Sequence, residues 1–299
     1  MSVTLANAKL LGLDDKQSAL AEEIITVDEL FSVLPFVPTA GNSYSYVREN
    51  ALVTAAGVAI DGAFTPGQST YTEKTLALAT VGAQVEINKL LQAQNVGQVV
   101  DGGLVASQLA RGAKSVGRKF AQWFITGDSS STGQFDGLDA IMADSAFAGQ
   151  KIDAADAALT LEMLDSLISA VSLRRPDALV MTSKARNKVR SLLRSLGGVT
   201  TIEVGGRMIP AFDGIPLLAN DWIGSDVDGV TAGSQQNIYA MCLGDDAVAG
   251  VTTVSVPGIN AEYVGINPTK DQDIYRVKMY GAVVVHSTKS IARLDSVTV

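Results

Sequence analysis

The sequence predicts a mixed α+β protein with a long extended excursion, and three observations lead to this prediction. Apolar residues recur at helical spacing between residues 101 and 126. Two β-prone segments enclose a Gly/Pro-rich middle between residues 42 and 87. Helical and strand patterns then alternate through the second half of the chain. Together these patterns predict helices and strands that share one core, with the excursion outside it.

The composition supports a folded chain with an unusual surface. The 299 residues include 23 Lys and Arg against 31 Asp and Glu, a net charge of −8. Charged residues make up 18%, whereas globular chains average about 25%. One interpretation is that other subunits cover much of the surface. A monomer coated with Ala, Gly, Thr and Ser is the alternative.

Single Cys and His residues exclude several classes of site. Cys242 is the only cysteine, so no internal disulfide or Cys-based zinc site can form, and it is expected in the core. His286 ends a strand-like apolar run and is expected to be a packed strand residue rather than part of a catalytic triad. No membrane-spanning run or signal peptide is evident, so a cytosolic protein is expected. The acidic pI of 4.7 argues against tight nucleic-acid binding.

An arm and an extended loop are expected to come first in the chain. Residues 1–41 hold a short amphipathic stretch closed by Pro35 and Pro38, with apolar side chains at Leu20, Ile24, Val27 and Phe31. Residues 42–87 predict a long hairpin or extended loop. Because this loop has little core of its own, we expect it to lie on a neighbouring molecule.

A long helix is predicted next, up to Gly127. Its apolar stripe consists of Val105, Leu109, Gly112, Val116, Phe120 and Phe124. Basic residues oppose the stripe at Arg111, Lys114, Arg118 and Lys119. That basic face is either solvated or in contact with acidic groups of a neighbouring subunit.

The second half predicts alternating elements. Thr160 is expected to cap one helix, and Thr182 or Ser183 a second helix that ends at Gly197. Residues 201–209 are typical of a hairpin around Gly205 and Gly206. Further strands are predicted at 178–181, 215–218, 238–243, 274–280 and 282–285.

No catalytic motif stands out. The loop Gly127-Asp-Ser-Ser-Ser-Thr-Gly133 lacks the ending of a phosphate-binding loop and the spacing of a nucleophile elbow. Solvated turns explain the paired carboxylates Asp226, Asp228, Asp271 and Asp273 better than a metal does. Subunit contact or solvation is likewise favoured for the basic cluster Arg174, Arg175, Lys184, Arg186, Lys188, Arg190 and Arg194. No enzyme activity, cofactor or metal is expected.

Four segments, in their order along the chain, carry a resemblance to a known family. They are Phe124-Ile-Thr-Gly-Asp128, Phe135-Asp-Gly-Leu138, Phe212-Asp-Gly-Ile-Pro-Leu-Leu-Ala-Asn-Asp221 and Tyr275-Arg-Val-Lys-Met-Tyr-Gly-Ala-Val-Val-Val-His286, with Ala292-Arg-Leu294 behind the last. With these segments the chain resembles the major capsid proteins of tailed bacteriophages, whose fold encapsulin shells share. The resemblance extends from about Leu20 onward.

The resemblance implies a division of the chain into five parts. They are an N-terminal arm at 1–41, an extended loop at 42–87, a peripheral domain with the spine helix at 88–137, an axial domain at 138–265, and C-terminal strands at 266–299 that return to the peripheral domain. No fused internal scaffold segment is expected, because the segment before the loop is short. A cross-link between Lys74 and Asn267 is weighed and not favoured.

The function implied is an icosahedral virion head shell, built from pentamers and hexamers of this chain around double-stranded DNA held by weak non-specific contact. Assembly in the host bacterial cytoplasm is expected, without a membrane, with a separate scaffold, a portal and a decoration protein as further partners. Two alternatives remain: an encapsulin-like compartment, and a metal-assisted enzyme using the four paired carboxylates. Subunit contacts are expected at the loop, at residues 200–207 and 226–235, and at Tyr44, Tyr46, Phe64, Lys74, Arg111, Lys114, Arg118 and Arg207.

Overall fold

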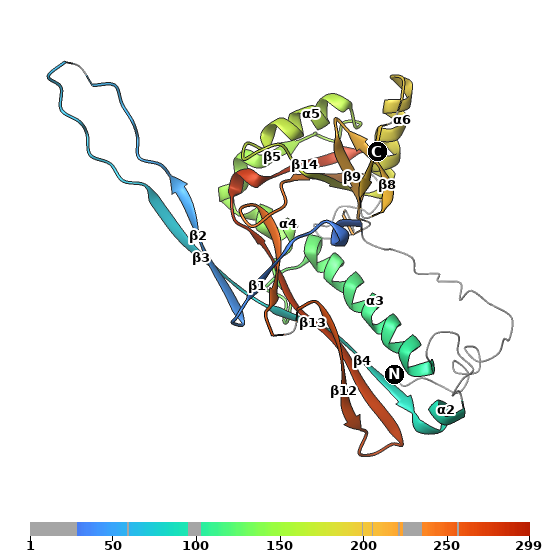
Figure 1. Cartoon of the computed structure of the whole chain (residues 1–299). Coiled ribbons are helices and arrows are strands. Elements are labelled where there is room, and N and C mark those ends of the chain that lie inside the picture. The colour runs from blue at the N-terminus through green and yellow to red at the C-terminus, as the bar shows by residue number, and fades with distance from the viewer. Residues whose placement is uncertain are drawn as a thin grey trace.

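The computed structural model of the chain shows a body of two β-sheets from which a long hairpin projects (Figure 1). It describes residues 29–58, 60–94, 103–198, 200–204, 206–220, 222–223, 235–255 and 257–299. The amphipathic stretch predicted around Leu20, Ile24 and Val27 lies outside these residues. No helix among the described residues is long and apolar enough to cross a membrane.

The first sheet has five strands. They are β1 (Phe36–Thr39), β4 (Ala79–Asn88), β11 (Val248–Thr253), β12 (Ile259–Ile266) and β13 (Gln272–Val285). The long strand β13 is central, because β4, β11 and β12 all pair with it in antiparallel register. It replaces the two strands expected at 274–280 and 282–285. The chain runs through Gly281 without turning, and a Cβ there would lie 2.9 Å from the Phe120 ring.

The predicted long helix is confirmed as α3 (Gly103–Thr126), which packs against β4, β12 and β13. Val116, Phe120 and Phe124 of the predicted stripe are buried in the main core. Gly112 allows close approach, because a Cβ there would lie 3.0 Å from Val277. The short helices α2 (Lys89–Gln94) and α4 (Leu138–Ala143) flank α3 in the sequence.

The second sheet has seven strands. In spatial order they are β5 (Lys151–Asp153), β14 (Ile291–Thr298), β10 (Gln235–Met241), β6 (Ala178–Met181), β9 (Ile215–Ala219), β8 (Arg207–Phe212) and β7 (Thr200–Val204). The hairpin expected at 201–209 is confirmed as β7 and β8. Leu179 and Met181 alternate with Ala178 and Val180 between two hydrophobic clusters, so both faces of β6 are buried.

Two helices cover one face of the second sheet. They are α5 (Leu161–Ala170) and α6 (Ser183–Ser195), and both predicted caps are confirmed. Thr160 Oγ1 accepts a hydrogen bond from Met163 N at 3.3 Å, and Thr182 Oγ1 from Ala185 N at 3.1 Å. The opposite face packs against α4, where Asp139 forms an ion pair with Arg293 of β14 at 3.2 Å.

The sheets distribute the later strands differently from the division expected at 138–265 and 266–299. Strands β11 and β12 lie in the first sheet, whereas β14 lies in the second. The physical reason is strand pairing. β11 and β12 each align with part of β13, and β14 inserts between β5 and β10.

The projecting hairpin consists of β2 (Ser43–Ala51) and β3 (Thr70–Ala77). Described residues between them form no regular element apart from a turn. The extended part is therefore shorter than the expected 42–87, because β4 leaves the hairpin and joins the first sheet.

Candidate assembly interface

The loop between β2 and β3, called the tip of the hairpin below, holds apolar side chains in solvent. Ile60 is 96% exposed, Phe64 84% and Leu52 72%. In Figure 1 this tip lies far from both sheets. Large apolar side chains gathered away from a core mark a surface that a partner covers. Phe64, an expected subunit contact, is therefore free to reach another molecule.

Arg48 anchors the base of the hairpin to the body, and sequence reasoning missed it. Its side chain is buried. Nη2 donates to the Val285 carbonyl at 2.8 Å and to the Tyr46 hydroxyl at 3.1 Å, and Nε donates to the His286 carbonyl at 3.3 Å. The guanidinium carbon also lies 5.2 Å from the centroid of the Phe147 ring. No local sequence pattern around this arginine indicates hydrogen-bond acceptors that lie more than 200 residues away in the chain.

Tyr44 and Tyr46 complete this anchor. Tyr46 donates to the Val285 carbonyl at 3.2 Å, and the Tyr44 hydroxyl lies 3.0 Å from His286 Nε2. His286 Nδ1 lies 3.3 Å from the Ala247 carbonyl, which can only accept. The neutral ring therefore donates from Nδ1 and accepts from Tyr44. Burial lowers the pKa of His286. The expected packing is confirmed, but His286 is half-buried and lies one residue beyond the end of β13 rather than in the strand.

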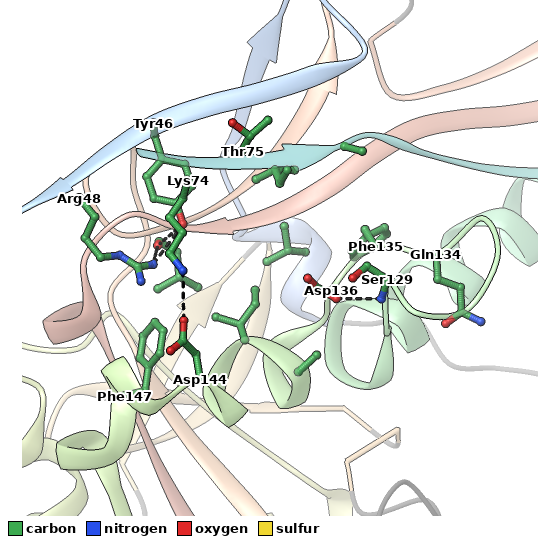
Figure 2. A pocket seen from close by; sticks show the side chains of 16 residues that line it. Tyr46, Arg48, Lys74, Thr75, Ser129, Gln134, Phe135, Asp136, Asp144 and Phe147 are labelled. Carbon is green, nitrogen blue, oxygen red and sulfur yellow. Dashed lines mark hydrogen bonds and ion pairs between the residues drawn. The ribbon is translucent and has the colours of Figure 1, made fainter. Parts of the chain in front are cut away.

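Lys74 lies on the opposite strand and lines a cleft of about 420 Å³ between hairpin and body. Figure 2 shows its amine directed at Asp144, at 3.3 Å. The pKa of Asp144 is lowered, first by a hydrogen bond from the Ala146 amide. Asn267 instead accepts from its neighbour Thr269. Lys74, Tyr44 and Tyr46 thus have contacts within the chain, and their role between subunits stays a prediction.

The basic face of α3 contacts aromatic rings. Arg118 lies 5.9 Å from the centroid of the Trp222 ring, while Arg111 is half-buried and Lys114 exposed. The backbone of Arg207 begins β8, but its side chain lies outside the described part, as do most of residues 226–235. Contacts of these residues with another subunit also stay predictions.

The paired carboxylates do not form a site in the described residues. Asp271 faces Lys89 at 3.8 Å, and Asp273 accepts from Tyr263 at 3.2 Å. Asp226 and Asp228 lie outside the described residues. Within the described part, no group of three or more His, Cys, Asp or Glu side chains could hold a metal.

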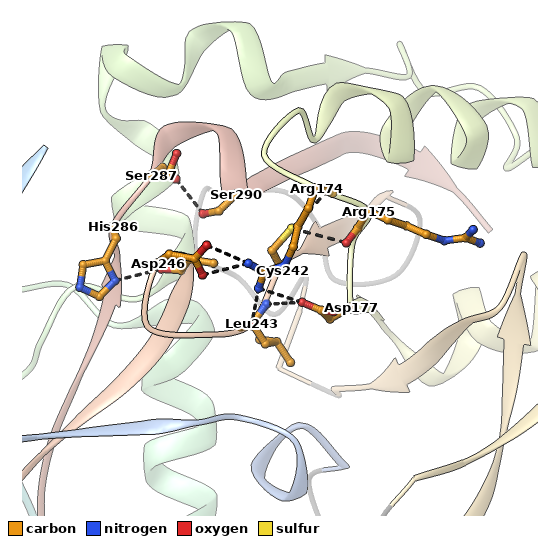
Figure 3. Close-up of polar contacts among 10 residues, drawn as sticks. Arg174, Arg175, Asp177, Cys242, Leu243, Asp246, His286, Ser287 and Ser290 are labelled. Atoms are coloured by element: carbon orange, nitrogen blue, oxygen red, sulfur yellow. Dashed lines mark hydrogen bonds and ion pairs between the residues drawn. The ribbon is translucent and has the colours of Figure 1, made fainter. Parts of the chain in front are cut away.

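Part of the basic cluster is structural. Figure 3 shows Arg174 between Asp246 and Asp177, with nitrogen–oxygen distances of 2.9 and 3.3 Å. Arg174 also donates to the Leu243 carbonyl at 2.6 Å. Cys242 lies beside this network, and burial raises the pKa of its thiol. The expected core cysteine is confirmed.

A second exposed apolar surface lies on β12, which sequence reasoning did not single out. Tyr263, Val264 and Ile266 are each between 43% and 57% exposed. The strand is an edge of the first sheet. Apolar side chains on an exposed edge strand are a further place where another chain could pair or pack.

Comparison with known proteins decides the fold. No protein-family model and no curated relative matches the sequence. Among solved structures, the SrpI encapsulin complex from Synechococcus elongatus is similar at a TM-score of 0.74 and 18% identity, over 100% of this chain and 97% of that chain. The chain has the fold of tailed-phage capsid and encapsulin shell proteins. It is also similar to a capsid chain of cyanophage A-1(L), at a TM-score of 0.71 and 15% identity over 96% of this chain and 97% of that chain.

Mycobacterium phage Bobi provides a third similar structure, with a TM-score of 0.67 and 13% identity over 99% of both chains. The coverage shows that this shell-protein fold accounts for the whole chain, including the hairpin. The resemblance seen in the sequence segments and the α+β class are confirmed at the level of fold. The expectation of no enzyme activity stays a prediction.

Proposed function

We propose that copies of this chain assemble into a closed shell in which each hairpin lies across a neighbouring subunit. The main observation behind this proposal is that the apolar side chains Leu52, Ile60 and Phe64 at the tip of the hairpin are exposed to solvent. A free subunit would keep them in water. Burying about 100 Å² of apolar surface contributes about 2.5 kcal/mol, so many repeated contacts can drive assembly.

The shell proposed is the icosahedral head of a tailed phage, formed from pentamers and hexamers around double-stranded DNA. Two of the three similar structures described above are from phages. The net charge of −8 supports weak rather than tight contact with DNA, because like charges repel the enclosed polymer. Scaffold, portal and decoration proteins would be separate chains.

An encapsulin-like compartment is the second candidate. The observation that favours it is the TM-score of 0.74 to an encapsulin, against 0.71 and 0.67 to the two phage structures. The two candidates differ in content: a phage head encloses DNA, whereas a compartment encloses cargo protein.

Electron microscopy of the purified protein tests the proposal. We expect shells, tubes or capsomer rings, and a monodisperse monomer across salt and protein concentrations would contradict the proposal. Ultraviolet absorbance and gel electrophoresis of purified shells then separate the candidates. Nuclease-resistant DNA supports the phage head, and a co-purified protein without DNA supports the compartment.

A shortened hairpin tests the role of the tip. Replacing residues 52–69 with Asn-Gly would join β2 and β3 by a two-residue turn at the pair Ala51 and Thr70. We expect a folded subunit that does not form shells. The matched control keeps the full hairpin and replaces exposed Thr72 by Ser. Shells from the shortened chain, or its failure to fold, would show that the tip is not an intersubunit arm.

A further inference from the structure

The two ends of the seven-stranded sheet carry opposite charges. At one end, β7 and β8 lie beside α6, whose arginines line a cleft with residues of these two strands. At the other end, β5 leads into α5, whose exposed side carries carboxylates. Figure 1 shows both helices over the same part of the molecule, with α5 next to β5 and β14 and α6 next to β8 and β9.

The basic end contains a formed cleft of about 390 Å³. Arg186, Arg190 and Arg194 line it at intervals of four residues, so they lie on one flank of α6. Arg186 is already paired with Glu29 at 2.7 Å. In the described part of the chain, Arg190 and Arg194 have no ion pair, and Arg190 Nε is buried without a hydrogen-bond acceptor. Two positive charges and one buried donor therefore remain for a ligand.

Apolar groups border this cleft. Met208, which is 67% exposed, lines it together with Ile209 and Pro210. Arg and Met are enriched at protein–protein interfaces. A bare polyanion such as DNA would gain nothing from the apolar border, and the net charge of −8 would oppose it.

The acidic end has matching unpaired groups. Glu162 and Asp165 are exposed on α5, three residues apart and therefore on one side of the helix. Asp153 is exposed at the end of β5. Within the described residues, none of these three carboxylates takes part in an ion pair.

We propose that this basic cleft binds the acidic end of a second copy of the chain, with Arg190 and Arg194 facing Glu162 and Asp165. The contact is head-to-tail, because the two surfaces lie at opposite ends of one sheet. Repetition of such a contact closes a ring when the rotation per subunit permits it. The inference rests on the proposed shell function and assigns the surfaces that join subunits within a ring.

A charge-swap experiment tests the pairing in the full chain. The basic double variant is Arg190→Glu with Arg194→Glu, and the acidic double variant is Glu162→Lys with Asp165→Lys. We expect each to lower shell yield at least about tenfold, a free-energy change of about 1.4 kcal/mol, and the combined variant to restore it. The control is Lys184→Glu with Lys188→Glu, which makes the same charge change on the other flank of α6.

The outcomes separate this inference from the proposed function. Absence of shells from the wild-type chain under all conditions would defeat the proposed function itself. Wild-type shells together with normal yields from both double variants would overturn the pairing, as would blocked variants that the combination does not rescue. Normal shells that lose DNA only in the basic variant would assign the cleft to a polyanion and also overturn it.

Folding of each variant is measured by circular dichroism and thermal unfolding of dissociated subunits. Because Arg190 is half-buried and Glu162 lies in the first turn of α5, the single variants Arg194→Glu and Asp165→Lys provide a second test at exposed positions. They should each reduce shell yield and restore it when combined. Full yields from both single variants would contradict the pairing.

Discussion

The projecting hairpin and the seven-stranded sheet are both β-structure, yet they bury their side chains to opposite extents. Leu179 and Leu217 in the sheet are fully buried between layers, whereas Leu52 and Ile60 near the tip of the hairpin are largely in solvent. The sheet pairs seven strands, and the hairpin pairs two. A two-stranded hairpin is marginally stable alone.

The two regions are stabilised by different contacts. The sheet is stabilised by its own helices, whereas the hairpin is held by its base, through Arg48, Tyr44 and Tyr46. Its tip has no such contacts within the described chain. Burial of the apolar side chains at the tip can therefore stabilise the protein only when another molecule covers them.

Truncation in the sheet should have the largest effect on the subunit. Leu179→Ala is expected to lower the free energy of unfolding by about 2–5 kcal/mol, because it opens a cavity between α5, α6 and β6. The matched variant Leu52→Ala should change it by less than about 0.5 kcal/mol. Denaturant unfolding of dissociated subunits measures both. Equal decreases in the free energy of unfolding for the two variants would show that the sheet and the hairpin tip contribute equally to subunit stability.

Loss of the anchor should have the next largest effect. Arg48→Leu is expected to cost about 1.5–3 kcal/mol, because the carbonyls of Val285 and His286 lose a charged donor. Hydrogen exchange at the amides of β2 should rise with it. Arg48→Lys, which keeps the charge and one donor, serves as the control. Unchanged exchange in β2 would show that the base is held by other contacts.

The parts of the fold that sequence predicted are those set by local patterns. Phe120 and Phe124 follow the helical period of α3, and Thr160 and Thr182 have the side chains of N-caps. Strand pairing was not predictable in this way. Neither β13 as a shared partner nor the contact between Arg48 and Val285 leaves a local signal, because each depends on segments far apart in the chain.

The candidate surfaces also differ in how far local sequence patterns predict them. The exposure of Phe64 was predictable, because an apolar residue in a Gly/Pro-rich loop has no local core. The basic cluster was visible too, but sequence could not separate Arg174, which is paired with Asp246, from Arg190, which has no ion pair among the described residues. That distinction depends on which carboxylates the fold brings near each arginine.

Acidification should have a smaller effect on the same anchor. Burial lowers the pKa of His286 in the folded chain, so the unfolded chain binds the proton first as pH falls below about 6.5. The free energy of unfolding should therefore decrease as pH falls from 7 toward 5. His286 is the only histidine, so His286→Gln should flatten this slope. A slope that persists in the variant would assign it to other groups.

The ion pair in the hairpin cleft should matter least for the subunit. Lys74 and Asp144 are each more than a third exposed, so Lys74→Ala should cost between about 0 and 1 kcal/mol and less at high salt. Thermal unfolding at two salt concentrations measures this. A loss as large as that of Arg48→Leu would show that the two strands anchor the hairpin equally.

The most direct test of the central claim measures the accessibility of the hairpin tip in the two states of the protein. In Phe64→Cys, a maleimide should label only the new thiol, because Cys242 is fully buried. We predict rapid labelling in dissociated subunits and labelling at least about tenfold slower in assembled shells. Equal rates in subunits and shells would contradict the claim that a neighbouring subunit covers the tip.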